Sequence, residues 1–121
     1  MTFPFEQLEV WRRSVDFVEK VLSLADQKID RKDGFSLGEQ LRRAVISISN
    51  NIAEGSGRNN RKEKRYFYNI AKGSVYEVVN LLEICKKRGY LEAEPHAVFY
   101  KQAEEIARML SGLMNSVRSN E

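Results

Sequence analysis

The stretch that decides the fold is QLRRAVISISNNIAEGSGRNNRKEKR, residues 40–65. Its first part repeats apolar residues at spacings of three and four, which predicts an amphipathic helix, and the Gly-Ser-Gly at 55–57 ends that helix. Basic residues follow at once. The stretch holds seven Arg or Lys and two Glu, a net +5, whereas the whole chain carries +3, so the remainder sums to −2. Positive charge is therefore gathered at one junction, where we expect a partner to bind.

The same apolar spacing predicts three further helices around this stretch. The first covers about 6–27 and is followed by a polar loop over 28–34. The third follows the basic run, and the fourth begins near Pro95. The expected inward faces are Leu8, Trp11, Val15, Val18, Leu22 and Ala25 in the first helix; Leu37, Leu41, Ala44, Val45, Ile48 and Ile52 in the second; Phe67, Ile70, Ser74, Val78, Leu81 and Cys85 in the third; and Ala97, Tyr100, Ala103, Ile106, Leu110, Leu113 and Val117 in the fourth.

Capping patterns support these helices. Ser36 followed by Glu39 is typical of a capping box, and Asn60 followed by Glu63 repeats the pattern at the start of the third helix. Cations at 86–88 followed by Gly89 fit a helix C-terminus, through the dipole and a left-handed cap. Four such helices joined by short loops predict an all-α fold, an antiparallel up-down-up-down four-helix bundle in a single domain over 1–121.

Composition narrows the functional classes. A chain of 121 residues with 42% hydrophobic and 31% charged residues is typical of one globular domain. Its apolar runs are too short to cross a bilayer, so we expect no membrane association, and the N-terminus has no secretion-signal pattern. The single cysteine, Cys85, cannot form an internal disulfide. We therefore expect a cytoplasmic protein.

The sequence indicates no catalytic or metal-binding constellation. His96 is the only histidine and has no Cys or His companion at a ligand spacing. Cys85 lies on an apolar face, which favours a small buried residue over a nucleophile. We therefore expect no catalytic residues, no metal, no cofactor and no enzymatic activity.

The basic residues after the Gly-Ser-Gly are the candidate nucleic-acid-binding site. They stand at the start of the third helix, where the macrodipole already disfavours cations. A helix that nevertheless carries cations at its start often binds an anion there. The alternative is a solvated charged face in which Glu54 and Glu63 are local partners. The candidate phosphate contacts, which we name the basic corner, are Arg58, Arg61, Lys62, Lys64 and Arg65.

Three aromatic residues adjoin the basic corner. Tyr66, Phe67 and Tyr68 give the mixture of rings and cations that single-stranded nucleic acid binding uses. Phe67 falls on the predicted inward face and Tyr68 on its edge, so core packing is the favoured interpretation for both. Only Tyr66 is expected to expose its ring.

The apolar faces of the second and third helices are wider than a surface helix needs. The extra width indicates either deeper burial in a small bundle or a subunit interface, and we expect assembly. The candidate oligomer-interface residues are Ile46, Ser49, Ala53, Tyr68, Val75 and Val79.

Three segments together resemble a known family: FEQLEVWRRSVDFV (5–18), QLRRAVISISNNIAEGSGR (40–58) and IAKGSVYEVVNLLEICKKRGYL (70–91). They are similar to the four-helix-bundle proteins encoded in intervening sequences of bacterial 23S ribosomal RNA genes, over nearly the whole chain. The fold is also similar to the accessory protein of diversity-generating retroelements, a basic pentameric bundle that partners a reverse transcriptase and binds nucleic acid. The most specific residues are Gln40, Arg42, Arg43, Asn51, Ile52, Ala53, Glu54, Gly55 and Arg58.

The resemblance implies a ring-like homo-oligomer, with a pentamer favoured, and an RNA or DNA context. It supplies no catalytic residues. The dense basic run at 61–65 departs from the family's usual pattern and strengthens the basic corner. Two functions follow: a non-catalytic homo-oligomer that binds RNA or another nucleic acid through phosphate contacts, or a protein-interaction scaffold or accessory subunit that binds no nucleic acid directly.

Overall fold

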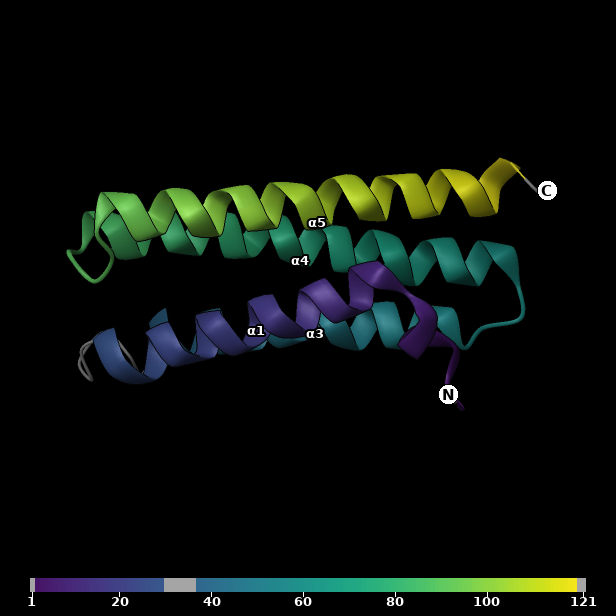
Figure 1. Ribbon diagram of the computed structural model, residues 1–121, viewed down its shortest axis with the longest axis horizontal. Coiled ribbons are helices and arrows are strands. Elements are labelled where there is room, and N and C mark those ends of the chain that lie inside the picture. The colour runs from purple at the N-terminus through teal and green to yellow at the C-terminus, as the bar shows by residue number, and fades with distance from the viewer. Residues whose placement is uncertain (1, 30–36, 120–121) are drawn as a thin grey trace.

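The computed structural model of the chain describes residues 2–29 and 37–119. Over these ranges a short 3-10 helix, η1 (Pro4–Gln7), precedes four long α-helices: α1 (Glu9–Lys28), α3 (Glu39–Ser56), α4 (Arg61–Lys87) and α5 (Ala93–Ser119). Successive helices run antiparallel, and the start of α1, the end of α5 and the α3–α4 turn lie at one end of an elongated bundle (Figure 1). The predicted all-α four-helix bundle is confirmed.

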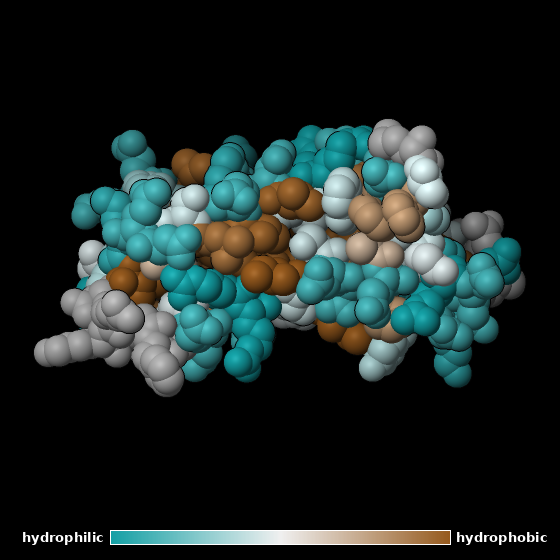
Figure 2. Space-filling view, turned by 90° about the horizontal axis from the view of Figure 1, so that it is seen from below, coloured by the Kyte–Doolittle hydropathy of each residue, from teal (hydrophilic) through white to brown (hydrophobic). Residues whose placement is uncertain are grey.

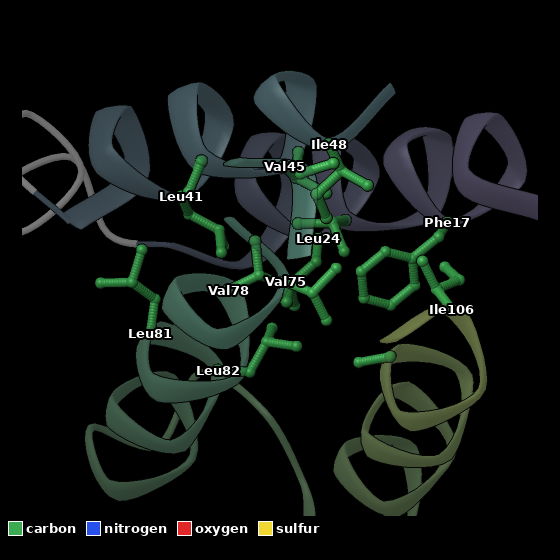
Figure 3. Close-up of a cluster of buried hydrophobic side chains, with 14 of the residues drawn as sticks. Phe17, Leu24, Leu41, Val45, Ile48, Val75, Val78, Leu81, Leu82 and Ile106 are labelled. Carbon is green, nitrogen blue, oxygen red and sulfur yellow. The ribbon is translucent and has the colours of Figure 1, made fainter. Parts of the chain in front are cut away.

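The core lies where the four helices face one another. Five of the six residues predicted for the inward face of the second helix are buried in α3: Leu41, Ala44, Val45, Ile48 and Ile52. The sixth, Leu37, precedes α3 and is half-buried. Figure 3 shows how side chains from all four helices converge on this core. The labelled residues are Phe17 and Leu24 from α1, Leu41, Val45 and Ile48 from α3, Val75, Val78, Leu81 and Leu82 from α4, and Ile106 from α5.

The inward face of α1 differs from the prediction. Only Ala25 was placed correctly; Leu8, Trp11, Val18 and Leu22 are half-buried, and Val15 is exposed. The side chains that are buried instead are Val10, Ser14, Phe17, Val21 and Leu24. The prediction is wrong because Ser14 interrupts the apolar repeat of the true inward face. Its hydroxyl tolerates burial by donating to the Trp11 carbonyl at 2.7 Å.

In α4 and α5 the predicted faces are partly confirmed. Ser74, Val78, Leu81 and Cys85 of α4 are buried, but Tyr68 and Ala71 take the places predicted for Phe67 and Ile70, which are half-buried. In α5, Ala103, Ile106 and Leu110 are buried, whereas Leu113 and Val117 are half-buried and Ala97 and Tyr100 are exposed. Steps of three residues from 97 to 103 rotate a stripe by about 120° around the helix, so these residues cannot share one face.

The helix ends follow the capping patterns where the structure describes them. The Asn60 side chain accepts the Glu63 backbone N–H at 3.1 Å, which confirms Asn60 as the N-cap of α4. At the other end Gly89 has φ +86°, and the Tyr90 N–H donates to the Cys85 carbonyl at 2.9 Å, which confirms the left-handed cap. Ser36 lies outside the described residues. Pro95 falls in the first turn of α5, where its missing N–H breaks no helical bond.

The α3–α4 pair is the most closely packed part of the bundle. A Cβ added to Gly55 would lie 2.8 Å from Tyr68 Cε1 and 3.0 Å from Phe67 Cβ, so only glycine fits there. Farther along the pair, the hydroxyls of Ser47 and Ser74 are hydrogen-bonded at 2.8 Å. Small side chains on both helices therefore allow this close approach. The α1–α5 pair, by contrast, has the least extensive contact between neighbouring helices.

We expect Gly55→Ala to lower the free energy of unfolding by about 1–3 kcal/mol, because the new methyl group must displace the buried Tyr68 ring. The matched control is Gly112→Ala in the middle of α5, where nothing lies within 4 Å of the new Cβ. There alanine should stabilise by about 0.5–1 kcal/mol. Urea unfolding measures both. Equal stability of Gly55→Ala and the wild type would contradict the close-packing account.

Candidate nucleic-acid interface

The basic corner lies at one end of the bundle, because Arg58 is in the α3–α4 turn and the other four cations are in the first two turns of α4. The C-terminal end of α5 lies at this same end (Figure 1). The structure therefore brings the predicted cations together. It also divides them into residues that bind their own chain and residues that do not.

Lys64 and Arg65 are bound to backbone carbonyls of neighbouring helices. Lys64 Nζ donates to the carbonyl of Ser56, the last residue of α3, at 2.9 Å. Arg65 Nε donates to the Met114 carbonyl, near the C-terminal end of α5, at 3.4 Å. A helix C-terminus favours positive charge, so Lys64 is placed where the dipole of α3 stabilises it. These two residues fasten α4 to its neighbours.

Arg58 is held against the start of α4. Its guanidinium carbon lies 4.6 Å from the centroid of the Phe67 ring, a cation–π contact. One terminal nitrogen approaches a Glu54 carboxylate oxygen at 3.4 Å, so the expected local partner is present. The buried Nε has no hydrogen-bond partner among the described residues. Arg58 therefore bridges the end of α3 and the first turns of α4.

Arg61 and Lys62 differ from the other three cations in having no partner among the described residues. Both are exposed and make no hydrogen bond or ion pair with a residue that the structure describes. They occupy the first turn of α4, where free N–H groups and the positive end of the dipole disfavour cations by a few tenths of a kcal/mol each. Their charge is not offset within the described part of the chain, and so these two cations are the ones available to an external anion.

The excess of positive charge is confined to α4. From Arg61 to Lys87 there are seven Lys or Arg and three Glu, which gives 7 − 3 = +4. The acidic and basic residues balance in each of the other three helices: four of each in α1, two of each in α3 and, with His96 neutral, three of each in α5. The residues outside these four helices sum to −1, which brings the +4 of α4 to the chain's net charge of +3.

The three aromatic residues beside the basic corner have separate roles. Tyr66 is 62% exposed, so the prediction of a free ring is confirmed. Phe67 is half-buried beneath Arg58, and its ring meets Tyr66 edge-on at 5.3 Å. Tyr68 is buried in the core, and this burial raises the pKa of its hydroxyl. Tyr76, which the sequence pattern did not single out, is also exposed and lies ten residues after Tyr66, about 80° away around α4.

The candidate oligomer-interface residues do not all reach the surface. The prediction is wrong for Tyr68 and Val75, because both are buried in the core of their own chain. Ile46 is 38% exposed, and Ser49, Ala53 and Val79 are half-buried. Adjacent residues on α4 differ by only about 100° around the helix, so the sequence pattern did not separate its core face from its outer flank.

A second apolar stripe lies on α1 instead, outside its inward face. It consists of Trp11, Val15, Val18 and Leu22, of which Val15 is 39% exposed and the others are half-buried. Figure 2, which views the bundle from the side of α1 and α3, shows apolar side chains gathered in the middle of this face. We name this surface, formed by the α1 stripe and Ile46, the α1–α3 face.

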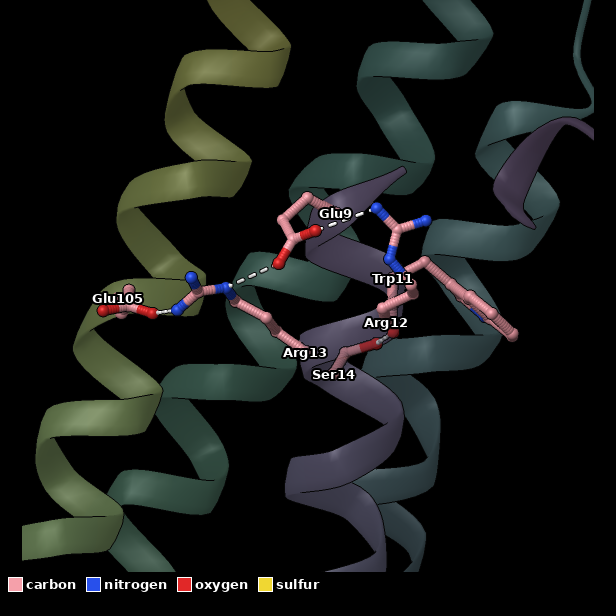
Figure 4. Close-up of polar contacts among 6 residues, drawn as sticks. All are labelled: Glu9, Trp11, Arg12, Arg13, Ser14 and Glu105. Atoms are coloured by element: carbon pink, nitrogen blue, oxygen red, sulfur yellow. Dashed lines mark hydrogen bonds and ion pairs between the residues drawn. The ribbon is translucent and has the colours of Figure 1, made fainter. Parts of the chain in front are cut away.

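The groove between α1 and α5, about 310 Å³ in volume, is lined largely by charged side chains, of which Glu9, Arg13 and Glu105 are paired with one another. Arg13 Nε donates to Glu9 at 3.1 Å and also forms an ion pair with Glu105 of α5 (Figure 4). Hydrogen bonds from Arg12 and then Arg13 lower the pKa of the Glu9 carboxyl. These charges join two helices that otherwise touch little.

The two residues considered for chemistry take part in packing. Cys85 is fully buried, and burial raises the pKa of its thiol to about 11, so the nucleophilic thiolate is disfavoured. His96 is largely buried, with Nε2 3.3 Å from a Glu83 carboxylate oxygen, and so links α5 to α4. Among the described residues, no three His, Cys, Asp or Glu side chains come together in a group that could hold a metal ion.

None of the helices, over the residues that the structure describes, is both long enough and apolar enough to span a membrane.

The fold and the charged end together define a small antiparallel four-helix bundle with one basic helix. A family model of the 23S rRNA-intervening sequence proteins matches residues 6–112, and the chain belongs to that family. A solved structure of a protein of unknown function from the S23 ribosomal protein family of Bacteroides thetaiotaomicron is similar in fold. It has a TM-score of 0.81 and 23% sequence identity, and the match covers 88% of this chain and 95% of that one. A comparison with curated proteins gives no match.

We expect Lys64→Ala to lower the free energy of unfolding by about 1 kcal/mol, because the Ser56 carbonyl loses its charged donor. Lys62→Ala is the matched control, since it removes the same charge from the same turn without breaking a contact. Its stability should stay within about 0.5 kcal/mol of the wild type. Guanidinium or urea unfolding distinguishes the two, and equal effects of both substitutions would show that Lys64 does not fasten α4 to α3.

Proposed function

We propose that this protein is a non-catalytic homo-oligomer that binds RNA or another nucleic acid through phosphate contacts at the basic corner. The observation that carries the proposal is the pair Arg61 and Lys62. Both are exposed and unpaired with any described residue, at a helix start that disfavours cations. A phosphate would offset that charge and could also accept hydrogen bonds from the free N–H groups of the first turn. The family's link to a 23S rRNA-intervening sequence supports a nucleic-acid context.

The five cations of the basic corner have two different roles in this proposal. Arg61 and Lys62 make the direct phosphate contacts. Arg58, Lys64 and Arg65 hold the corner in place through Phe67, Ser56 and Met114, and their charge adds to the positive potential at that end. Phosphate contacts of this kind position a nucleic acid but carry no sequence information. Specificity then depends on the shape of the nucleic acid or on a further contact.

Assembly through the α1–α3 face completes the proposal. This face exposes Val15 and Ile46 beside half-buried apolar residues, and burying it in a contact with a second copy removes that surface from water. Contacts from several identical subunits to one strand would multiply a modest affinity. The resemblance to pentameric bundles favours a ring of five.

The same apolar face also supports a second candidate function, a protein-interaction scaffold. In that case the α1–α3 face holds the assembly together, and the basic corner meets an acidic protein. The scaffold predicts a stable oligomer in light scattering that has no measurable affinity for RNA or DNA.

The proposal predicts that Arg61→Ala/Lys62→Ala weakens binding to a fluorescent single-stranded 20-mer of uridine and reduces its salt dependence. Two phosphate contacts contribute a slope of about −1.4 to log K against log salt per engaged subunit, and the double variant should lose this amount. Fluorescence anisotropy at several salt concentrations measures it. The matched control is Arg43→Ala/Lys101→Ala, which removes the same charge from exposed positions on α3 and α5.

Wild-type slope and affinity in the Arg61→Ala/Lys62→Ala variant, or an equal loss in the control, would refute the assigned phosphate contacts. An assembled wild-type protein that does not bind the oligonucleotide at low salt would favour the scaffold.

A further inference from the structure

The outer face of α4 is one continuous exposed stripe that begins at the basic corner. Its residues recur at spacings of three and four, so they lie within an arc of about 80° and extend along about 37 Å of helix. None of them is acidic, and every one is exposed. They are Lys62, Tyr66, Asn69, Gly73, Tyr76, Asn80, Ile84 and Lys87. We name this surface the α4 stripe.

Two exposed aromatic rings belong to the α4 stripe. Tyr66 is 62% exposed and Tyr76 is 64% exposed, the highest values among the large hydrophobic side chains that the structure describes. Ten residues separate them, which places them about 15 Å apart along the helix. The core does not require either ring, since Tyr68 and Val75 provide the neighbouring buried contacts. Both rings are therefore open to solvent on one side, and Tyr76 also lines a groove between α4 and α5 with Tyr100.

Between the two rings the helix backbone is open. Gly73 has nothing within 4 Å of the position that a Cβ would take, so packing within the described chain gives no reason for glycine there. A glycine in the middle of a helix costs roughly 0.5–1 kcal/mol relative to alanine. The missing side chain leaves the backbone between Tyr66 and Tyr76 uncovered. Asn69, one turn before it, presents an amide that can both donate and accept hydrogen bonds.

Charge determines which occupant fits this surface. The net +4 of α4 would repel the same helix of a second copy, and α1, α3 and α5 carry no net charge that could complement it. A phosphate backbone does complement it. A duplex keeps its bases stacked inside, whereas a single strand can turn its bases onto exposed rings. The stripe thus combines positive charge for the phosphates with exposed rings for the unpaired bases of a single strand.

We infer that the α4 stripe is a track for single-stranded nucleic acid, in which Arg61 and Lys62 hold phosphates and unpaired bases stack on Tyr66 and Tyr76. The inference rests on the proposed function and adds the form of the nucleic acid and the residues that hold its bases. Stacking tolerates every base, so the track selects unpaired strands over duplexes rather than one sequence.

The experiment compares Tyr66→Ala and Tyr76→Ala with Val98→Ala, in which a 56% exposed apolar side chain is removed from the neutral helix α5, away from the groove that Tyr76 lines. Anisotropy is measured with the single-stranded uridine 20-mer and with a 20-base-pair RNA duplex. Each of the first two variants should bind the single strand at least about fivefold more weakly, since stacking contributes roughly 1–3 kcal/mol per base. Duplex binding should be unchanged in these two variants, and Val98→Ala should bind the single strand as the wild type does. Tyr66→Phe and Tyr76→Phe keep the ring and should bind within about twofold of wild type.

The outcomes separate this inference from the proposed function. Wild-type single-strand affinity in both tyrosine-to-alanine variants, together with weaker binding in Arg61→Ala/Lys62→Ala, would overturn the track and leave the phosphate site standing. Failure of the wild-type protein to bind either nucleic acid would overturn both. Light scattering provides a further test, because dissociation of the assembly by Tyr76→Ala would make the α4 stripe a subunit interface and overturn the track.

Discussion

The close contact between Gly55 of α3 and the Tyr68 ring of α4 is the constraint on which the rest of the structure depends. It leaves no room for a Cβ, so the Tyr68 ring of α4 lies directly against the backbone of α3. Because the two helices meet there, the α3–α4 turn is short and the Ser56 carbonyl lies within reach of Lys64. Arg58 is brought over Phe67 by the same turn. The basic corner is therefore a consequence of packing in the core beneath it.

The bundle separates its surfaces by chemistry. The α1–α3 face and part of α5 expose apolar side chains, while the excess of positive charge lies on α4 beside Tyr66 and Tyr76. In the proposed function, the molecule assembles through the α1–α3 face and binds a polyanion along α4. The three engaged cations show that a cluster of Arg and Lys residues need not act as a unit. Lys64 and Arg65 bind backbone carbonyls of α3 and α5, and only Arg61 and Lys62 remain for an external ligand.

Local patterns in the sequence predict the fold well and the site only in part. The α3 face, the Asn60 cap, the Gly89 terminus and the exposure of Tyr66 depend on residues close in sequence. The α1 face was misplaced because a buried serine breaks the apolar repeat. The engagement of Lys64 and Arg65 could not be foreseen, since their acceptors, Ser56 and Met114, lie 8 and 49 residues away. Such contacts exist only once the helices are packed.

The central claim is that nucleic acid lies along α4. Ultraviolet cross-linking of the assembled protein to a single-stranded uridine oligonucleotide, followed by mass spectrometry of the peptides, tests it most directly. We predict that the cross-linked residues fall between Arg61 and Lys87 and include Tyr66 or Tyr76. Cross-links concentrated on the α1–α3 face, or spread evenly over all four helices, would contradict the account.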